Sequence, residues 1–233
     1  MSCRVVINQS NYLPWKGYFD LIHDADVFIF LDDVQYTKND WRNRNRFKGP
    51  NGTFWLTIPT GGSTSQRISD VRLPRGPWAQ KQWRTLSHNY RTSPYFSDYS
   101  SFFLHAFESM EWRTLSDFNQ HLIKVIARDF LHLNTRFMNS AQFGFDATGQ
   151  DKVISLIKAV NGTSYISGPA AKAYLDPAAF AAAGIELIWK DYSGYPEYQQ
   201  PYPPFEHAVS VVDLLFCVGP HAADYIWGWR TTT

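Results

Sequence analysis

The chain has 233 residues, which is long for one small domain and short for two, since ~150 residues per domain is typical. Its hydrophobic fraction of 44% and charged fraction of 18% are those of a globular protein and exclude a wholly disordered chain. Its 22 lysines and arginines against 21 aspartates and glutamates leave a net charge of +1, which argues against a protein wrapped around nucleic acid.

The sequence contains no segment typical of export or of membrane insertion. Its first residues, MSCRVVIN, lack the apolar stretch of a signal peptide, and no run of ~18 apolar residues follows that could form a membrane span. Cys3 and Cys217 form no CxxC motif, and no Cys/His spacing typical of zinc occurs, so no bound metal is expected. We therefore expect a cytoplasmic protein.

The first third of the chain predicts a βαβ unit. Residues 4–8 form a short apolar run, 17–23 carry apolar residues at helical spacing, and 27–31 form a second apolar run. A strand, helix and strand in this order pair in parallel through a right-handed crossover. A further strand is expected at 53–59, after the Asn51-Gly52 turn.

The middle of the chain predicts helices, and the last third returns to α/β. Helical spacing covers residues 78–132, and its clearest repeat runs over 116–131 with Ser116 as the N-cap. The last third is expected to hold a helix at 151–160, a strand at 163–167, a short helix capped by Asp176-Pro177, a strand at 185–190 and a helix at 207–218.

These elements predict an α/β fold with a Rossmann-like, mainly parallel sheet and an inserted helical segment. The strands at 4–8, 27–31, 163–167 and 185–190 should lie in that one sheet. We expect residues 1–233 to form a single α/β domain, with 77–144 as a helical insert or subdomain within it.

The loop after the first predicted strand is the first candidate site. Parallel α/β sheets bind ligands beyond the carboxyl ends of their strands, next to helix N-termini. Here the loop supplies Gln9, Asn11 and Tyr12 as hydrogen-bonding groups. No G-x-G-x-x-G or Walker pattern is present, so the standard dinucleotide and P-loop sites are not predicted. An ordinary loop with a proline turn explains the segment equally well.

Two adjacent carboxylates, Asp32 and Asp33, follow the second predicted strand. Such a pair suits a general base, a metal ligand or an anchor for an amine, and a turn-forming pair is the alternative. Successive side chains of a strand point to opposite sides, so only one of the two should face the site. We expect one cleft at this edge of the sheet, lined by Gln9, Asn11, Asp33, Trp41 and Arg44.

Residues 38–48, KNDWRNRNRFK, concentrate positive charge in a chain that is otherwise near neutrality. In an extended strand, alternate arginines would share one face, and their planar guanidinium groups suit a diphosphate. The interleaved aromatic residues would also suit RNA, and a solvated basic strand is the simple alternative. The substrate-binding residues predicted here are Lys38, Trp41, Asn43, Arg44 and Arg46.

A second anion-binding candidate is SGPAAK, residues 167–172, which follows a predicted strand. Its backbone N–H groups, with Ser167 and Lys172, could hold an anion. Turn formation before the next helix explains the segment equally well. The seven histidines form no zinc-peptidase pattern, and G-x-S-x-G is absent, so a serine hydrolase is not predicted.

Five stretches of the sequence resemble the WbqC-like family. They are QSNYLPWKGYFDLI (9–22), LDDVQYTKNDWRNRNRFK (31–48), SGPAAKAYLD (167–176), GIELIWKDYSGYPEY (184–198) and FEHAVSVVDLLF (205–216). Two positions depart from the family pattern, because Ser10 replaces a proline and Gln82 replaces a histidine that often follows lysine. The resemblance implies a role in bacterial surface-polysaccharide (O-antigen, lipopolysaccharide) biosynthesis, where some members are proposed to transfer glycine or another acyl group to an amino sugar.

The opening of the chain is also similar to that of nucleotidylyltransferases, which carry Gly-His where this chain has Gly17-Tyr18. That likeness implies a related Rossmann-like sheet. Because Tyr18 replaces the histidine that would bind phosphates, it does not imply nucleotidyl transfer.

The leading hypothesis is an acyl- or aminoacyl- (glycyl-) transferase that acts on a nucleotide-linked amino sugar. Asp33 is expected to remove the proton of the attacking amine, and Asn11 or a nearby backbone N–H to stabilise the oxyanion. Tyr12 and Trp41 are expected to stack on the base or the sugar. The donor stays open among a carrier-protein thioester, coenzyme A and aminoacyl-tRNA.

The expected partners are therefore a nucleotide sugar and an acyl-carrier-type donor protein, with nucleic acid only as a tRNA donor. Two alternatives belong to other classes. One is a nucleotidylyltransferase-like enzyme that uses ATP and Mg²⁺ on Asp32 and Asp33. The other is a non-catalytic sugar-nucleotide-binding module.

Overall fold

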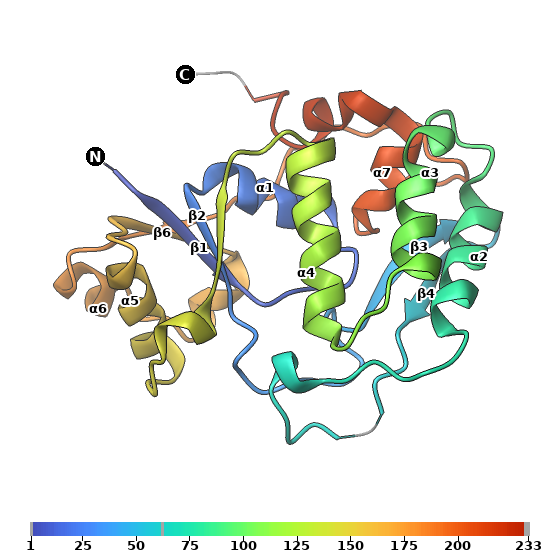
Figure 1. Ribbon diagram of the computed structural model, residues 1–233. Coiled ribbons are helices and arrows are strands. Elements are labelled where there is room, and N and C mark those ends of the chain that lie inside the picture. Colours follow the sequence, from blue (N-terminus) through green and yellow to red (C-terminus); the bar gives the residue numbers. More distant parts are fainter. Residues whose placement is uncertain (1, 62, 231–233) are drawn as a thin grey trace.

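In the computed structural model, which describes residues 2–61 and 63–230, five parallel strands form one sheet (Figure 1). They are β1 (Arg4–Asn8), β2 (Val27–Phe30), β5 (Arg136–Asn139), β6 (Ser164–Ser167) and β7 (Glu186–Trp189). Their spatial order is β5-β2-β1-β6-β7, and every neighbouring pair is parallel. The predicted α/β fold with a mainly parallel sheet is confirmed.

All four predicted sheet strands lie in this sheet, but the sequence does not predict β5. This strand has only four residues, RFMN. The first, Arg136, is exposed, and the other three are half-buried. The strand forms because it pairs in register with β2 at the edge of the sheet, from Val27 opposite Arg136 to Phe30 opposite Asn139. It lies within 77–144, the segment expected to be a helical insert.

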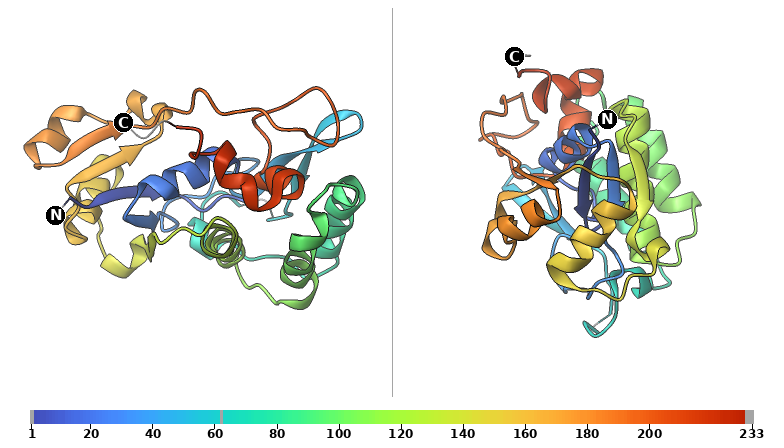
Figure 2. Two further views of the ribbon diagram at one scale, coloured as in Figure 1. Left: turned by 90° about the horizontal axis from the view of Figure 1, so that it is seen from above. Right: turned by 90° about the vertical axis from the view of Figure 1, so that its left-hand side faces the viewer.

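The two faces of the sheet are covered by different layers of helices (Figures 1 and 2). Alternate residues of β1 and β2 point to opposite faces. Val5, Ile7, Val27 and Ile29 belong to the core under α5 (Gly149–Ala159) and α6 (Pro177–Ala182). The opposite face, with Val6, Phe28 and Phe30, packs with α1 (Lys16–Asp24) and the helices of the middle of the chain in a larger core.

The middle of the chain is helical, as the spacing predicts. It contains α2 (Trp78–Tyr90), α3 (Phe96–Leu104) and α4 (Leu115–Val125), and π-helical turns at His105–Ser109 and Ile126–Phe130 extend the last two. The predicted cap is wrong, since α4 begins one residue earlier and Thr114 caps it by accepting from the N–H of Asp117 at 3.1 Å. Ser116 lies inside the first turn and bonds to Asp32 instead.

A separate antiparallel hairpin, β3 (Arg44–Gly49) and β4 (Gly52–Thr57), projects from the sheet. Gly52 has a φ of +102°, which the tight turn requires and glycine adopts without strain. Arg44 and Arg46 share one face of β3, as predicted, whereas Arg42 lies in the turn before the strand.

The last helix, α7 (Val211–Val218), begins four residues after the predicted start at 207. Its N-cap is Ser210, whose hydroxyl accepts from the N–H of Val212, and the proline-rich segment before it has no helical structure. Short 3₁₀ turns occupy Ile68–Asp70, Ser140–Phe143, Pro169–Ala173 and Gly219–Tyr225. Across 2–61 and 63–230, no helix has the length and apolar character that a membrane crossing demands.

An ion-pair cluster ties the C-terminal residues to α1. Lys190 contacts both Asp20 (2.9 Å) and Asp24, and Arg230 contacts the same two carboxylates. Burial by itself would raise the pKa of Asp24, but hydrogen bonds from His23 and Lys190, with the charges of Lys190 and Arg230, lower it from 3.8 to about 2. The folded state therefore holds Asp24 ionised more strongly than the unfolded chain does.

We predict that Asp24→Asn lowers the free energy of unfolding by at most roughly 2 kcal/mol at pH 6. Because the folded pKa is depressed, this contribution is present above pH 3.8 and is lost as the pH falls through about 2. Denaturant unfolding of both proteins at a series of pH values measures it. Asp224→Asn, in the exposed pair with His221, is the matched control and should change little. A difference between Asp24→Asn and wild type that stays constant down to pH 2 would contradict the assignment.

Candidate functional site

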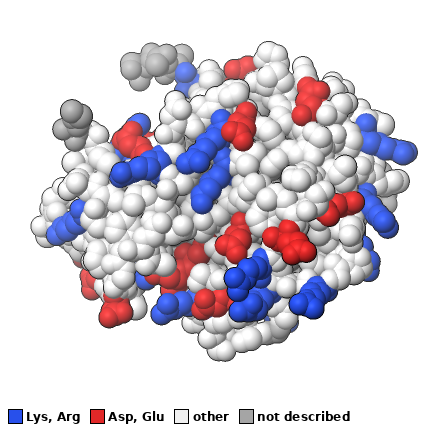
Figure 3. Space-filling view, viewed as in Figure 1, with Lys and Arg blue, Asp and Glu red and all other residues white. Residues whose placement is uncertain are grey.

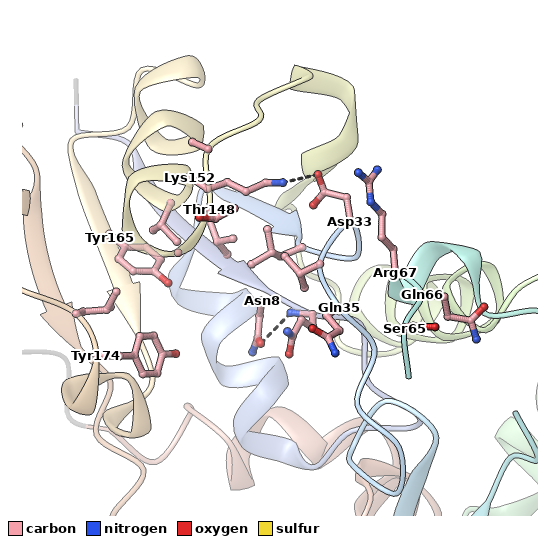
Figure 4. Close-up of a pocket in the computed structure, with 18 residues that line it drawn as sticks. Asn8, Asp33, Gln35, Ser65, Gln66, Arg67, Thr148, Lys152, Tyr165 and Tyr174 are labelled. Carbon is pink, nitrogen blue, oxygen red and sulfur yellow. Dashed lines mark hydrogen bonds and ion pairs between the residues drawn. The ribbon is translucent and has the colours of Figure 1, made fainter. Parts of the chain in front are cut away.

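A cavity of about 820 Å³, here called the sheet-edge cavity, opens at the carboxyl ends of β1 and β2 (Figure 4). Its volume lies within the ~300–1,000 Å³ typical of small-molecule sites. The polar residues that line it come from six separate segments: Asn8, Gln9, Asp33, Gln35, Ser65, Gln66, Arg67, Thr148, Lys152, Tyr165 and Tyr174.

The strand order explains why a cavity forms here. From β1 the chain passes through α1 to β2 on one side, and it later crosses the sheet through α5 to reach β6 on the other side of β1. The connections therefore run in opposite directions on either side of β1, which leaves a crevice at its carboxyl end. Open α/β sheets bind their ligands at such a switch point.

Asp33 lies in this cavity and is ionised. Its carboxylate accepts from Lys152 Nζ at 2.7 Å and from the hydroxyl of Ser140. Burial alone would raise the pKa of Asp33, but the hydrogen bonds from Lys152 and Ser140 and the charge of Lys152 lower it. Arg67 lines the same cavity and is labelled with Asp33 and Lys152 in Figure 4. The cation paired with the carboxylate is Lys152.

The amino end of α5 forms another wall of the cavity. Thr148 occupies the N-cap position but makes no side-chain cap bond, so its hydroxyl and the first N–H groups of the helix remain available. This end of a helix carries partial positive charge, whereas the charge of Lys152 is balanced by Asp33. Asp151 of the same turn is exposed and does not line the cavity. The wall favours an anionic ligand such as a phosphate.

Asp32 points away from the cavity into the protein, as strand alternation predicts. It is 4% exposed, and its oxygens accept from the Ser10 N–H (2.8 Å), the Ser116 hydroxyl and Gln120 Nε2 (2.9 Å). This set of bonds makes Asp32 a structural residue. Asp32 and Asp33 both line a further cavity of about 440 Å³, where their oxygens accept from Ser116, Gln120 and Ser140.

The expected single cleft is wrong, because four of its five residues are divided between two cavities and Arg44 lines neither. Gln9 and Asp33 line the sheet-edge cavity, whereas Asn11 and Trp41 line a second cavity of about 230 Å³. We call this the tryptophan cavity, and its lining residues are Asn11, Pro14, Trp15, Trp41, Asn45 and Ala208. The alternation of side chains along the backbone explains this division. Asp32 accepts from the N–H of Ser10, and the side chains of Gln9 and Asn11, on either side of Ser10, point in different directions.

The predicted diphosphate site on the basic segment does not form, because its cations serve the fold. Arg42 binds Asp40 (3.0 Å), Arg46 donates to the carbonyl of Ala208 (3.1 Å), and Arg44 stacks on the ring of Trp55 (4.3 Å). Lys38 is exposed and lines neither cavity. Basic and acidic side chains are interspersed on the face seen in Figure 3.

Two other predicted binding residues belong to the core. Tyr12 is fully buried, stacks on Phe118 at 6.1 Å and donates its hydroxyl to Gln82. Asn43 is 2% exposed and donates to the carbonyl of Ile58. Gln82, at the position where relatives often carry histidine, is thus a structural partner of Tyr12 and is absent from the lining of both cavities.

The segment of Ser167 and Lys172 also lies outside the sheet-edge cavity. Ser167 is buried at the end of β6, and Lys172 is exposed with its ammonium over the ring of Trp189 at 5.6 Å. The residues that follow, Tyr174 and Leu175, do line the cavity.

Sequence reasoning missed Lys152, Arg67, Thr148 and Tyr174 as cavity residues. A signal existed for Lys152 and Thr148 only, since both belong to the start of a predicted helix at the carboxyl edge of the sheet. Arg67 and Tyr174 lie in irregular segments without a motif.

Among the described residues, the group with potential metal-ligand atoms close together is Asp20, His23 and Asp24. Lys190 and Arg230 already neutralise these carboxylates. The cluster is accordingly an ion-pair network, and it lies apart from the sheet-edge cavity.

Comparison with known proteins identifies the relatives of the chain. Residues 9–225 match the WbqC-like protein family. The chain belongs to this family. It is 39% identical over 225 residues to the uncharacterized protein Rv1507c of Mycobacterium tuberculosis (strain ATCC 25618 / H37Rv), an alignment that covers 96% of this chain and 97% of that protein. No solved structure matches. The family match begins at Gln9, so both cavities of this WbqC-like protein are built largely from residues within the matched region.

We predict that Asp32→Asn lowers the free energy of unfolding by about 1–3 kcal/mol, because the amide nitrogen cannot accept from Ser116 or Gln120. The matched variant Asp33→Asn should cost less, since water in the cavity can solvate Lys152. Denaturant unfolding of both variants measures the two losses. A larger loss for Asp33→Asn would reverse the structural roles given to these carboxylates.

Proposed function

We propose that this WbqC-like protein is a cytoplasmic acyl- or aminoacyl- (glycyl-) transferase that modifies a nucleotide-linked amino sugar for surface-polysaccharide biosynthesis. The observation that carries the proposal is the sheet-edge cavity, where the Asp33 carboxylate, paired with Lys152, lies next to the open amino end of a helix. Family membership supports the polysaccharide context. Because Asn11 and Asp33 line different cavities, Asn11 is not available for a chemical step at Asp33.

The nucleotide sugar is proposed to lie across the cavity from α5 to Tyr174. Its diphosphate faces the first N–H groups of α5 and Arg67, which offer hydrogen bonds and positive charge. Tyr165 and Tyr174 line the same cavity from the far side, and Tyr174 is 73% exposed, so its ring is free to stack on a base. Gln9 and Gln35 offer amide groups to sugar hydroxyls.

The chemical step requires a base and an acid, and the Asp33–Lys152 pair can serve as both. The lone pair of the neutral acceptor amine attacks the acyl carbon of the donor, so a C–N bond forms while the bond to the leaving sulfur or oxygen breaks. Asp33 takes the proton of the nitrogen, and Lys152 gives a proton to the leaving group. The proton on Asp33 then passes to Lys152 along their 2.7 Å hydrogen bond, which restores both groups.

The oxyanion needs donors within the same cavity. Asn11 lines the tryptophan cavity, so it cannot take the role that the sequence suggested. Because the N–H groups of α5 are assigned to the diphosphate, the hydroxyl of Thr148 is the proposed donor, since it makes no cap bond and lines the same cavity as the Asp33–Lys152 pair.

We predict that Asp33→Asn reduces transfer by ~10²–10⁴-fold, because the amide cannot take the proton of the amine. Mass spectrometry of UDP- and dTDP-amino sugars incubated with a glycyl-thioester donor measures the product. Asp129→Asn, an exposed carboxylate on the π-helical turn Ile126–Phe130, is the control and should keep full activity.

Three outcomes would contradict the transferase proposal. Equal turnover by Asp33→Asn and wild type would remove Asp33 from the mechanism. Magnesium-dependent release of pyrophosphate from a nucleoside triphosphate would favour the nucleotidylyltransferase alternative. Binding of nucleotide sugars without turnover across thioester, coenzyme A and aminoacyl-tRNA donors would favour a binding module.

A further inference from the structure

The tryptophan cavity has an aromatic wall that the proposed transfer reaction does not use. Trp41, which lines it, is 42% exposed and lies against Trp55, which is 45% exposed. Their ring centroids are 5.5 Å apart and the planes meet at 36°. Exposed indoles are uncommon on a soluble surface without a partner, and here two of them adjoin a cavity.

The turn that leads to the lining residues Pro14 and Trp15 is strained and held in place. Leu13 has a φ of +40°, which a branched side chain rarely adopts, and Asn45 fixes this turn by donating to the carbonyls of Leu13 (2.7 Å) and Tyr12 (3.2 Å). Trp15 is equally fixed, because its ring occupies the space above Gly17, where an added Cβ would come within 2.2 Å of it. Backbone strain that neighbouring groups hold in place is concentrated at functional sites.

The polar groups at the cavity are donors. Asn11 Oδ1 already accepts from Arg42 at 2.8 Å, so the Nδ2 group of Asn11 is what this side chain offers to a ligand. Arg42 and Arg44 do not line the cavity, and they are engaged by Asp40 and by the ring of Trp55. The residues that line the cavity are all uncharged, which favours a neutral, hydroxyl-bearing ligand over a phosphate.

We infer that the tryptophan cavity binds one neutral pyranose ring of a carbohydrate. The C–H groups on one face of such a ring pack on the electron-rich face of an indole, and a hydroxyl of the ring accepts from the amide of Asn11. A volume of about 230 Å³ is below the range of nucleotide-sized sites and suits a single ring. The site shares no lining residue with the sheet-edge cavity, so it can exist whether or not the proposed transfer occurs.

Saturation-transfer NMR with methyl glycosides of glucose, galactose and N-acetylglucosamine tests this site. We expect saturable binding of at least one probe, with the strongest transfer to protons on one face of its ring. Trp41→Ala should weaken that binding by about tenfold or more, and Trp41→Phe should restore part of it. The control Tyr174→Ala removes an exposed ring from the other cavity and should leave glycoside binding unchanged.

Failure to bind any of the three glycosides up to their solubility limit would overturn the inference, as would binding that Trp41→Ala leaves unaltered. Displacement of the glycoside by uridine diphosphate would also overturn it, because the ligand would then share the site proposed for nucleotides. None of these results depends on transfer activity. A protein that binds glycosides through Trp41 but transfers no acyl group would refute the proposed function alone.

Discussion

The buried carboxylate of Asp32 determines how the functional surface of this protein is arranged. It joins the end of β2 to the loop after β1 through the N–H of Ser10, and to α4 through Ser116 and Gln120. A proline, which the family pattern has at position 10, carries no N–H and could not make the first of these bonds. In this chain, one side chain therefore links the sheet, the loop and the helical segment.

The direction of the neighbouring side chains follows from that link. With Ser10 held against the core, Gln9 opens into the sheet-edge cavity and Asn11 into the tryptophan cavity. With Asp32 turned inward, Asp33 faces Lys152 at the carboxyl edge of the sheet. The same few residues thus separate a polar cavity of nucleotide size from a small aromatic one. A transferase with two substrates would have separate surfaces for recognising each of them.

The sequence was sufficient for four of the five sheet strands but not for the site. Apolar runs predicted β1, β2, β6 and β7, of which β2 and β6 are buried throughout, whereas β5 has no such run and depends on pairing with β2. Alternation predicted that Asp32 and Asp33 point in different directions, and Asp32 is buried while Asp33 lines the sheet-edge cavity. The basic segment was misinterpreted because Arg46 donates to the carbonyl of Ala208, which is 162 positions away. The local sequence does not indicate so distant a partner. The pairing of Lys152 with Asp33, 119 positions away, was missed as well, although the place of Lys152 at the start of a predicted helix was a signal.

The proposed function requires a nucleoside diphosphate to bind at the amino end of α5. Two-dimensional ¹H–¹⁵N NMR of the labelled protein during a titration with uridine diphosphate tests this directly, because amide protons that contact phosphate shift strongly. We expect saturable changes in the amide chemical shifts of Thr148, Gly149 and Lys152, with smaller changes near Asp33 and Arg67. Shifts centred on Trp41 and the β3–β4 hairpin, or none that saturate, would contradict it.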